Sequence, residues 1–304
     1  MGGDHRMIKN RIRRTMIFLN MQRASLVKDA FVYKPDCVIF DLEDAVAESE
    51  KDSARIQLYH TLTELDYQGV ERWVRINALD SDLFEEDIRA AVAGGAEGIR
   101  LPKTEKAEDV QLVEHLVEAA EKEFGKEVGS TMLMAALESP LAIINAYEIA
   151  CSSERLMGIA LSAGDYTRTM HSKRTNEGKE LFYARSQMLV AARAADVMAF
   201  DTVYTDVNDM EGFVNEVQMI ADMGFDGKSC ISPKQISVAH EIFNPTQKEI
   251  DHAIHVIEAV RESEDQGIGV LVVDGKMVDI AWVEGAQRVL NLAKASGQYK
   301  GDLA

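Results

Sequence analysis

Short apolar segments, each followed by an amphipathic segment, recur eight times along this chain of 304 residues. The apolar segments have the length and composition of β-strands that are buried on both faces. They span residues 15–19, 37–42, 72–77, 98–102, 131–138, 158–163, 198–205 and 228–232. Helical periodicity lies between them, for example in residues 107–124, where Val110, Val113 and Val117 recur on one face. This alternation restricts the fold to classes built on a parallel sheet.

Eight alternations over about 250 residues predict an α/β fold, a parallel (β/α)8 barrel of the TIM type. A doubly wound open sheet is the alternative, but no Gly-x-Gly-x-x-Gly turn follows the first predicted strand. No Pro- or Gly-rich linker divides the first 260 residues. We therefore expect a flexible leader over residues 1–12 and a catalytic barrel over residues 13–265.

The remaining residues, 266–304, predict a separate C-terminal extension. Residues 269–273 and 276–282 read as two strands, and Asp274-Gly275 between them favours the tight turn of a β-hairpin. A helix is predicted over residues 283–294. A hairpin and one helix are too small to fold alone, so we expect the extension to pack on the barrel or on a neighbouring subunit.

The composition limits the partners of this protein. A formal net charge of −18 argues against nucleic-acid binding, which needs a basic face. It also means that an anionic substrate must meet a local group of cations or a metal ion. No apolar run approaches the ~20 residues that span a bilayer, and the basic N-terminus lacks the apolar core of a secretion signal. Scattered Cys37, Cys151 and Cys230 suit a reducing cytoplasm.

Charged and polar residues gather where the predicted strands end, which is where the catalytic residues of such barrels lie. They are Asp41, Glu43 and Asp44 after the second strand, Arg75 and Asn77 after the third, Arg100 and Lys103 after the fourth, Glu138 after the fifth and Asp165 after the sixth. Helix capping alone could explain single aspartates. It does not explain Arg75 and Arg100, because a guanidinium is unfavourable near helix N-termini unless an anion is present. The mixture predicts a divalent metal and an acid substrate.

Glu138 and Asp165 follow neighbouring strands and are the predicted metal ligands. A site with two carboxylates and no histidine or thiolate suits Mg²⁺, which keeps several waters and takes further ligands from its substrate. Zinc is disfavoured because the sequence has no His-Glu-x-x-His motif. His252 and His255 are more simply residues of an exposed helix face.

Nine segments, in this order, closely resemble the β subunit of bacterial citrate lyases, the citryl-thioester lyase. They are RRTMIFL, CVIFDLEDAV, VRINALD, GIRLPKTE, VGSTMLMAALESPLAIINAYEIA, ALSAGDY, ELFYAR, GFDGKSCISPKQI and DGKMVD. One segment alone, such as FDLEDAV, would indicate only the wider HpcH/HpaI family of malyl-, citramalyl- and citryl-CoA lyases and related aldolases. The resemblance extends from about Arg13 to Leu292.

The resemblance implies a role for each candidate residue. Glu138 and Asp165 are the implied Mg²⁺ ligands, and Asp279 is an acid/base from an adjacent subunit. Arg75 holds the keto-acid product, and Arg75 and Arg100 stabilise the charge that develops in the reaction. Glu43 and Asp44 are implied catalytic residues and, with Asp41, order metal-bound water and neighbouring cations.

The thioester arm, CoA or a CoA-like group, is implied to cross the loop after the first strand and the basic residues near it. The implied substrate-binding residues are Arg14, Asn20, Asp41, Arg75, Arg100 and Lys103. Relatives often carry Pro-Gly-Asn in that loop and an acidic or aromatic residue where this chain has Gly164.

The implied reaction is a Mg²⁺-dependent retro-Claisen cleavage of a citryl thioester, on CoA or on an acyl carrier protein, to oxaloacetate and an acetyl thioester. Implied partners are the carrier protein, the α subunit of a citrate lyase complex and further copies of the chain in a trimer or hexamer. One alternative is a malyl-CoA or citramalyl-CoA lyase of the same family. Another is a non-catalytic scaffold subunit, against which the joint presence of Arg75, Glu138, Asp165 and Asp279 argues.

Overall fold

The computed structural model describes residues 11–264, 271–273, 276–278 and 280–303. Contacts divide the chain into a barrel unit, Arg13–His240, and a C-terminal unit that begins at Glu241. The division falls well before residue 265, where the sequence suggested that the barrel ends. Of the expected leader, residues 1–10 lie outside the described part.

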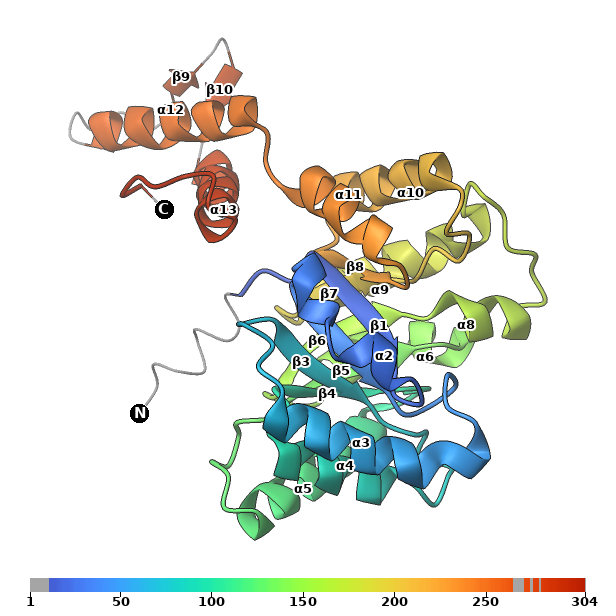
Figure 1. Cartoon of the computed structure of the whole chain (residues 1–304). Coiled ribbons are helices and arrows are strands. Elements are labelled where there is room, and N and C mark those ends of the chain that lie inside the picture. Colours follow the sequence, from blue (N-terminus) through green and yellow to red (C-terminus); the bar gives the residue numbers. More distant parts are fainter. Residues whose placement is uncertain (1–10, 265–270, 274–275, 279, 304) are drawn as a thin grey trace. The chain divides into compact units, whose positions relative to one another are not determined.

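Eight parallel strands close into a barrel in sequence order, with β8 paired to β1, which confirms the predicted fold (Figure 1). The strands are β1 Thr15–Asn20, β2 Cys37–Asp41, β3 Glu71–Arg75, β4 Gly98–Leu101, β5 Met132–Leu137, β6 Leu156–Leu161, β7 Met198–Asp201 and β8 Gly227–Cys230. Every predicted strand is present, and most differ from the prediction by one to four residues at an end. A closed barrel brings the carboxyl ends of all its strands to one rim.

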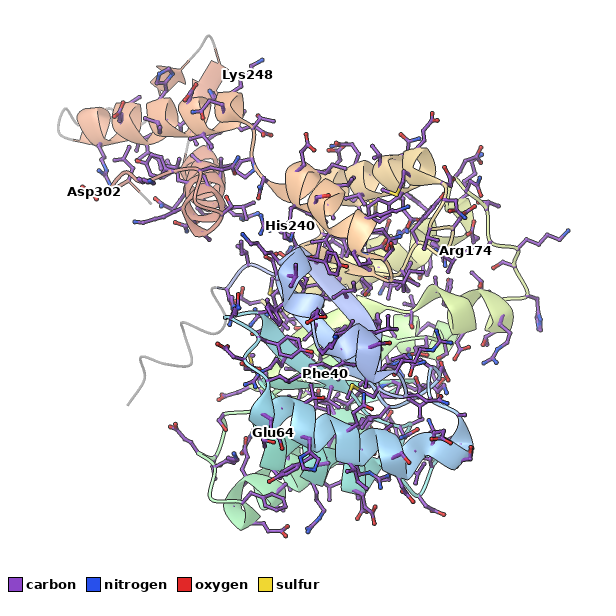
Figure 2. All side chains as sticks on the ribbon, viewed as in Figure 1. Phe40, Glu64, Arg174, His240, Lys248 and Asp302 are labelled. Carbon is purple, nitrogen blue, oxygen red and sulfur yellow. The ribbon has the colours of Figure 1, made fainter. Side chains whose placement is uncertain are left out.

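Helices connect the strands and cover the outside of the barrel. They are α2 Ala24–Val27, η1 Ala30–Tyr33, η2 Glu48–Glu50, α3 Lys51–Glu64, α4 Phe84–Gly94, α5 Ala107–Glu123, α6 Pro140–Ile144, α7 Ala146–Ala150, α8 Ala163–Thr169, η3 Lys179–Leu181, α9 Phe182–Ala194, α10 Met210–Met223 and α11 Pro233–Phe243. Strand residues such as Phe40 are fully buried, whereas Glu64, at the end of α3, is exposed (Figure 2). No helix within the described residues is long and apolar enough to span a membrane.

The N-terminal end of the barrel is closed by a buried ion pair. Arg13 donates to Glu71 through Nε and Nη2, at 2.6 and 2.8 Å, and Trp73 Nε1 donates to the same carboxylate at 2.9 Å. Gly227 lets the chain close here, because a Cβ atom at this position would lie 2.0 Å from the carbonyl oxygen of Arg13. This end is therefore packed and neutralised, and it leaves the opposite rim for chemistry.

A second group of buried charges lies where β7 and β8 meet α9 and α10. Arg185 donates to both carboxylate oxygens of Asp201 at 2.8 and 2.9 Å and pairs with Glu216 at 2.9 Å. Lys228 Nζ donates to Asp201 at 2.8 Å, to Glu216 at 2.7 Å and to the Thr202 carbonyl at 2.8 Å. We call Arg185, Asp201, Glu216 and Lys228 the outer network. It contains two cations and two anions, so its charges balance.

The C-terminal unit is built from α12 Gln247–Glu264, the antiparallel strands β9 Leu271–Val273 and β10 Lys276–Val278, and α13 Ile280–Ala295. The hairpin expected at Asp274-Gly275 is confirmed by the pairing of β9 with β10, although those two residues lie outside the described part. Trp282 was expected in the second strand and instead lies in the first turn of α13. The helix forms because Ala286, Leu290 and Ala293 share one buried face.

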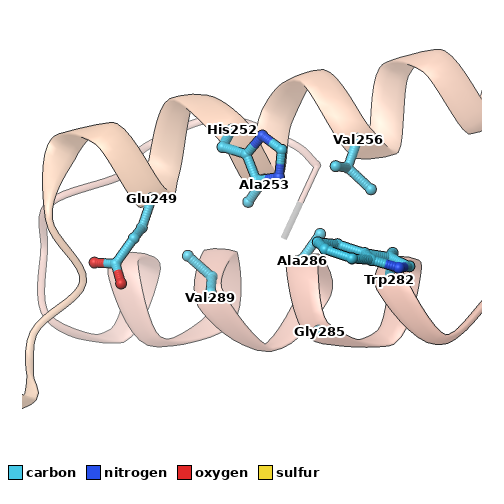
Figure 3. Close-up of a pocket in the computed structure, with 8 residues that line it drawn as sticks. All are labelled: Glu249, His252, Ala253, Val256, Trp282, Gly285, Ala286 and Val289. Carbon is cyan, nitrogen blue, oxygen red and sulfur yellow. The ribbon is translucent and has the colours of Figure 1, made fainter. Parts of the chain in front are cut away.

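Helices α12 and α13 pack against each other around a shared apolar core. A pocket of about 470 Å³ opens between them (Figure 3). Its wall includes the ring of Trp282, which meets the ring of His252 edge to face at a centroid distance of 6.4 Å. The pairing explains why α12 belongs to this unit rather than to the barrel, where the sequence had put it.

Candidate active site

The first group of predicted site residues meets at the carboxyl ends of β2, β3 and β4. Strand register aligns Asp41 with Arg75, and Arg75 with Arg100. Arg75 donates to both oxygens of Asp41 at 2.8 and 2.7 Å, and its Nη1 pairs with Glu43 at 2.8 Å. Lys103 pairs with the other oxygen of Glu43 at 2.8 Å. The acidic run after β2 therefore neutralises cations of β3 and of the loop after β4.

A buried lysine holds the backbone of this acidic run. Lys51 Nζ donates to the carbonyls of Leu42 and Glu43 at 2.8 and 2.7 Å, and to Asn77 Oδ1 at 2.6 Å. Asp87 accepts from both the backbone and the side-chain amide of Asn77, at 2.9 and 2.7 Å. Asn77 therefore links Lys51 to Asp87 and helps to hold Lys51 in place.

The two glutamates at this rim, Glu43 and Glu138, have raised pKa values. Burial raises the pKa of Glu43, although Arg75 and Lys103 act to lower it. Burial and the neighbouring Glu43 raise the pKa of Glu138 to about 7. Glu138 is 4% exposed, and its Oε1 has no hydrogen-bond partner. A carboxylate in such a position is stabilised by an added cation.

Asp44 lies at the solvent edge of the same group. Its carboxylate is 3.9 Å from both Arg75 and Lys103, and its side chain is 64% exposed. It contributes charge to the rim without a close contact. We call Asp41, Glu43, Arg75, Lys103 and Glu138 the rim cluster.

Asp165 is presented by the first turn of α8, after β6. Arg168, one turn later, pairs with it at 3.0 Å. The start of α8 is fixed by Thr202, whose Oγ1 accepts from the backbone amide of Ala163 at 3.0 Å. The carbonyl of Thr202 in turn accepts from Lys228. The outer network thus anchors the segment that fixes the start of this helix.

One pocket of about 660 Å³ contains both predicted metal ligands. Its wall carries the cations Lys103, Lys106 and Arg168 among the carboxylates Asp80, Glu105, Asp109, Glu138 and Asp165. Glu138 and Asp165 therefore line one pocket, and a shared metal site there stays a prediction. Mixed charges in a concave pocket suit an anionic ligand bound together with a metal ion.

The donor set fits Mg²⁺. Glu138 is buried and its Oε1 has no hydrogen-bond partner, so a bound cation would stabilise its charged form. Asp165 supplies a second carboxylate in the same pocket. Among the described residues, no group of three or more His, Cys, Asp and Glu side chains is arranged to hold a metal ion. An ion held by two carboxylates completes its shell with water and substrate, which is the habit of Mg²⁺ rather than zinc.

Two arginines share one aromatic ring inside the barrel. The guanidinium carbons of Arg75 and Arg100 each lie 5.1 Å from the centroid of the Phe18 ring in β1. Arg100 is 2% exposed, and its Nη1 contacts only Ser229 Oγ at 3.5 Å and Met134 Sδ at 3.9 Å. Burial and the like charge of Arg75 lower the pKa of Arg100 to about 10.

The two remaining predicted substrate-binding residues lie at opposite ends of the barrel. Asn20 ends β1 at the rim and donates to the Ala45 carbonyl at 2.6 Å, so it braces the acidic loop. Arg14 precedes β1 at the far end, where its Nε and Nη2 donate to Asp36 at 2.9 and 2.8 Å. Arg14 therefore lies away from the rim, because it precedes the strand instead of following it, and its role in substrate binding stays a prediction.

Most residues of the pocket wall did not figure in the sequence prediction, and three of them, Glu105, Ser139 and Asn145, are hydrogen-bonded to one another. Ser139 caps α6 and donates to Glu105 at 2.5 Å, and Asn145 donates to the Glu105 carbonyl at 2.8 Å. Ser139 directly follows Glu138, so its position after the fifth strand was an available signal. Asp279, the predicted acid/base, lies outside the described residues.

Comparison with known proteins agrees with this geometry. The model of the HpcH/HpaI aldolase/citrate lyase family matches residues 14–233. The citrate lyase subunit beta of Leuconostoc mesenteroides is 50% identical over 95% of this chain and 96% of its own length. A (3S)-malyl-CoA thioesterase of Cereibacter sphaeroides is 35% identical over 94% and 96%. The crystal structure of CitE from Mycobacterium tuberculosis with magnesium, acetoacetate and coenzyme A has 27% identity and a TM-score of 0.73, covering 95% and 99% of the two chains.

Proposed function

Because the chain belongs to the HpcH/HpaI aldolase and citrate lyase family, we propose that it is a carbon–carbon lyase that cleaves a citryl thioester to oxaloacetate and an acetyl thioester. The observation that carries the proposal is Glu138, a buried carboxyl with an unpartnered oxygen and a pKa near 7, in a pocket with Asp165. The relatives at half identity carry the name of this lyase, and the malyl-CoA thioesterases are more distant.

Glu138 and Asp165, the two predicted ligands that line one pocket, are the proposed Mg²⁺ ligands. When bound, the ion supplies Lewis-acid polarisation of the substrate hydroxyl and its neighbouring carboxylate. Before binding, Arg168 neutralises Asp165. The relative from Mycobacterium tuberculosis, crystallised with magnesium, supports this assignment.

The proposed step is a retro-Claisen cleavage. The tertiary hydroxyl loses its proton, the bond from its carbon to the thioester α-carbon breaks, and the electron pair passes into the thioester enolate, which takes a proton at carbon. Arg75 stabilises the charge that develops on the keto-acid side. Asp41 and Glu43 set the orientation of Arg75, and Asp44 adds negative charge nearby. Asp279 is the proposed proton carrier, a role that rests on the family resemblance alone.

A thioester arm, on CoA or on an acyl carrier protein, is the proposed substrate carrier. Asn20 and Lys103 stand at the rim where such an arm would enter. The name of the relatives at half identity, a lyase subunit, supports assembly with an α subunit, a carrier protein and further copies of this chain. A cytoplasmic location also stays a proposal; it suits Cys37, Cys151 and Cys230, which are free thiols.

The decisive experiment is oxaloacetate release from citryl-CoA by the purified protein, with Mg²⁺ and after its removal by a chelator. We expect turnover only with the ion. Malyl-CoA and citramalyl-CoA, assayed in parallel, test the two family alternatives. Failure to cleave any of the three, with Mg²⁺ present, would leave the scaffold alternative.

A further inference from the structure

Arg100 differs from the other cations of the site in what it contacts. Arg75 has Asp41 and Glu43 as partners, and Lys103 has Glu43. Within the described part of the chain, no carboxylate forms an ion pair or hydrogen bond with Arg100, and its Nε has no partner at all. A buried guanidinium that contacts a hydroxyl, a thioether and an aromatic ring but no carboxylate is costly. Such a group is poised for an anion that arrives from outside the chain.

The position of Arg100 connects it with the metal pocket. Its guanidinium lies against Phe18, on whose ring Arg75 also rests. Among the carboxylates that act on Arg100, Glu138, a wall residue of the pocket, has the largest electrostatic effect. An anion that enters beside Glu138 and Arg75 therefore approaches Arg100 next. Desolvation of this cation has already occurred in the fold, so binding does not have to remove its water again.

The substrates of the family differ in one carboxylate. A citryl thioester carries two free carboxylates, and a malyl thioester carries one. In the proposed reaction, the metal ion and Arg75 would bind the first carboxylate, which lies on the carbon that bears the hydroxyl. The second needs another cation, and Lys103 is already paired with Glu43.

We propose that Arg100 binds the second carboxylate of the substrate and thereby selects a citryl over a malyl thioester. This inference rests on the proposed function and adds the residue that determines specificity. The same contact holds the second carboxylate of oxaloacetate after cleavage. A bidentate guanidinium–carboxylate contact in a dry site is strong enough to discriminate between ligands that differ only by this group.

Oxaloacetate and pyruvate form a matched pair of probes, because they differ by this one carboxylate. Their dissociation constants, measured calorimetrically with Mg²⁺ present, give a selectivity ratio that needs no turnover. In Arg100→Met, we expect the affinity for oxaloacetate to fall at least about 30-fold more than the affinity for pyruvate. Arg100→Lys keeps the charge but loses the two-pronged guanidinium geometry, so its selectivity ratio should lie between those of Arg100→Met and the wild type.

Arg89→Met, which removes a half-exposed arginine on α4, is the control and should leave the ratio unchanged. Arg100→Met should fold, because methionine replaces an unpaired buried charge with an apolar chain of similar length. Equal weakening of both probes, or no change in oxaloacetate affinity, would overturn the proposal. The citryl-CoA assay with wild-type protein tests the reaction separately, so a negative result there is distinct from an unchanged ratio here.

Discussion

The outer network and the rim cluster are both groups of buried charges, but they differ in how well their members are matched. In the outer network, each cation meets both anions at 2.7–2.9 Å. These pairs lower the pKa of Asp201 and raise that of Arg185, so the charged forms are favoured. In the rim cluster, burial raises the pKa of Glu43 and Glu138, so the charged forms are disfavoured.

Burial alone therefore does not decide whether a charge stabilises the fold. Asp201 is 0% exposed and Glu138 is 4% exposed, yet the pKa shifts of the two carboxyls have opposite signs. The outer network has its partners within the chain. In the rim cluster, Glu138 still has an oxygen without a partner, and the Nε of the neighbouring Arg100 has no partner either. A metal ion and a substrate can supply the missing charges, so the mismatch favours this part of the barrel as the ligand site.

The largest expected effect comes from breaking the matched group. Lys228→Met leaves Asp201 and Glu216 with only Arg185, an uncompensated buried negative charge. We expect the free energy of unfolding to fall by about 3–5 kcal/mol, measured by urea denaturation. Lys179→Met removes an exposed lysine that pairs only with Glu177, and it should leave the denaturation midpoint unchanged. Equal, small effects of the two substitutions would mean that the outer network contributes little.

The corresponding substitution in the mismatched group should do the opposite. Glu138→Gln keeps the shape and removes the charge, so turnover of citryl-CoA should fall by about 10²–10³. Stability without Mg²⁺ should rise instead. Because the folded-state pKa of about 7 lies above the ordinary 4.5, ionisation of Glu138 opposes folding. The wild type should therefore lose stability relative to the variant as the pH rises from 4.5 to 7, by about 2–3 kcal/mol.

Thermal and urea denaturation of both proteins at several pH values measure this difference. Glu127→Gln, at an exposed loop carboxyl, is the control for the loss of one negative charge. A constant gap between wild type and Glu138→Gln from pH 4.5 to 7 would contradict the raised pKa. A gap that disappears when Mg²⁺ is added would support a metal ligand.

The smallest effect tests the link between the two groups. Thr202→Val keeps the shape of a residue that is 2% exposed but removes the acceptor for Ala163 at the start of α8. Because Asp165 lies in that turn, we expect Mg²⁺ affinity to weaken about tenfold, with a stability loss of about 1 kcal/mol. Calorimetric titration with Mg²⁺ measures the affinity, and urea denaturation measures the stability.

Thr202→Ser, which retains the hydroxyl, should restore Mg²⁺ affinity. Thr61→Val, at a buried position of α3, controls for the loss of a threonine hydroxyl elsewhere. If Thr202→Val loses stability but binds Mg²⁺ like the wild type, the hydrogen bond to Ala163 has no role in holding Asp165.

The sequence was sufficient for the barrel because its strands are continuous apolar runs, and it was sufficient for the rim because every strand end faces the same way. It also located Glu138 and Asp165 for that reason. It did not separate Arg14 from Asn20, since closeness to a strand in sequence does not tell which end of the barrel a residue occupies. It failed at Trp282, where alternating residues 276–282 favoured a strand and packing of α13 on α12 prevailed.

The contrast between Arg75 and Arg100 was beyond the sequence. Both are arginines near strand ends, and in register they are neighbours. Only the three-dimensional arrangement gives Arg75 two carboxylates and Arg100 a hydroxyl and a thioether. Partner choice across a barrel depends on side-chain length and direction, which no spacing along the chain encodes.

Lys51 has a consequence for anyone who would transplant this site into another barrel. Its ammonium group has three protons, and the carbonyls of Leu42 and Glu43 and the amide of Asn77 take one each. These acceptors surround a tetrahedral donor, a geometry that the flat fork of arginine does not reproduce. A graft that copied the acidic loop and the arginines but left out this lysine would carry the right charges. Its loop backbone would not be held, so the carboxylates could point away from the arginines.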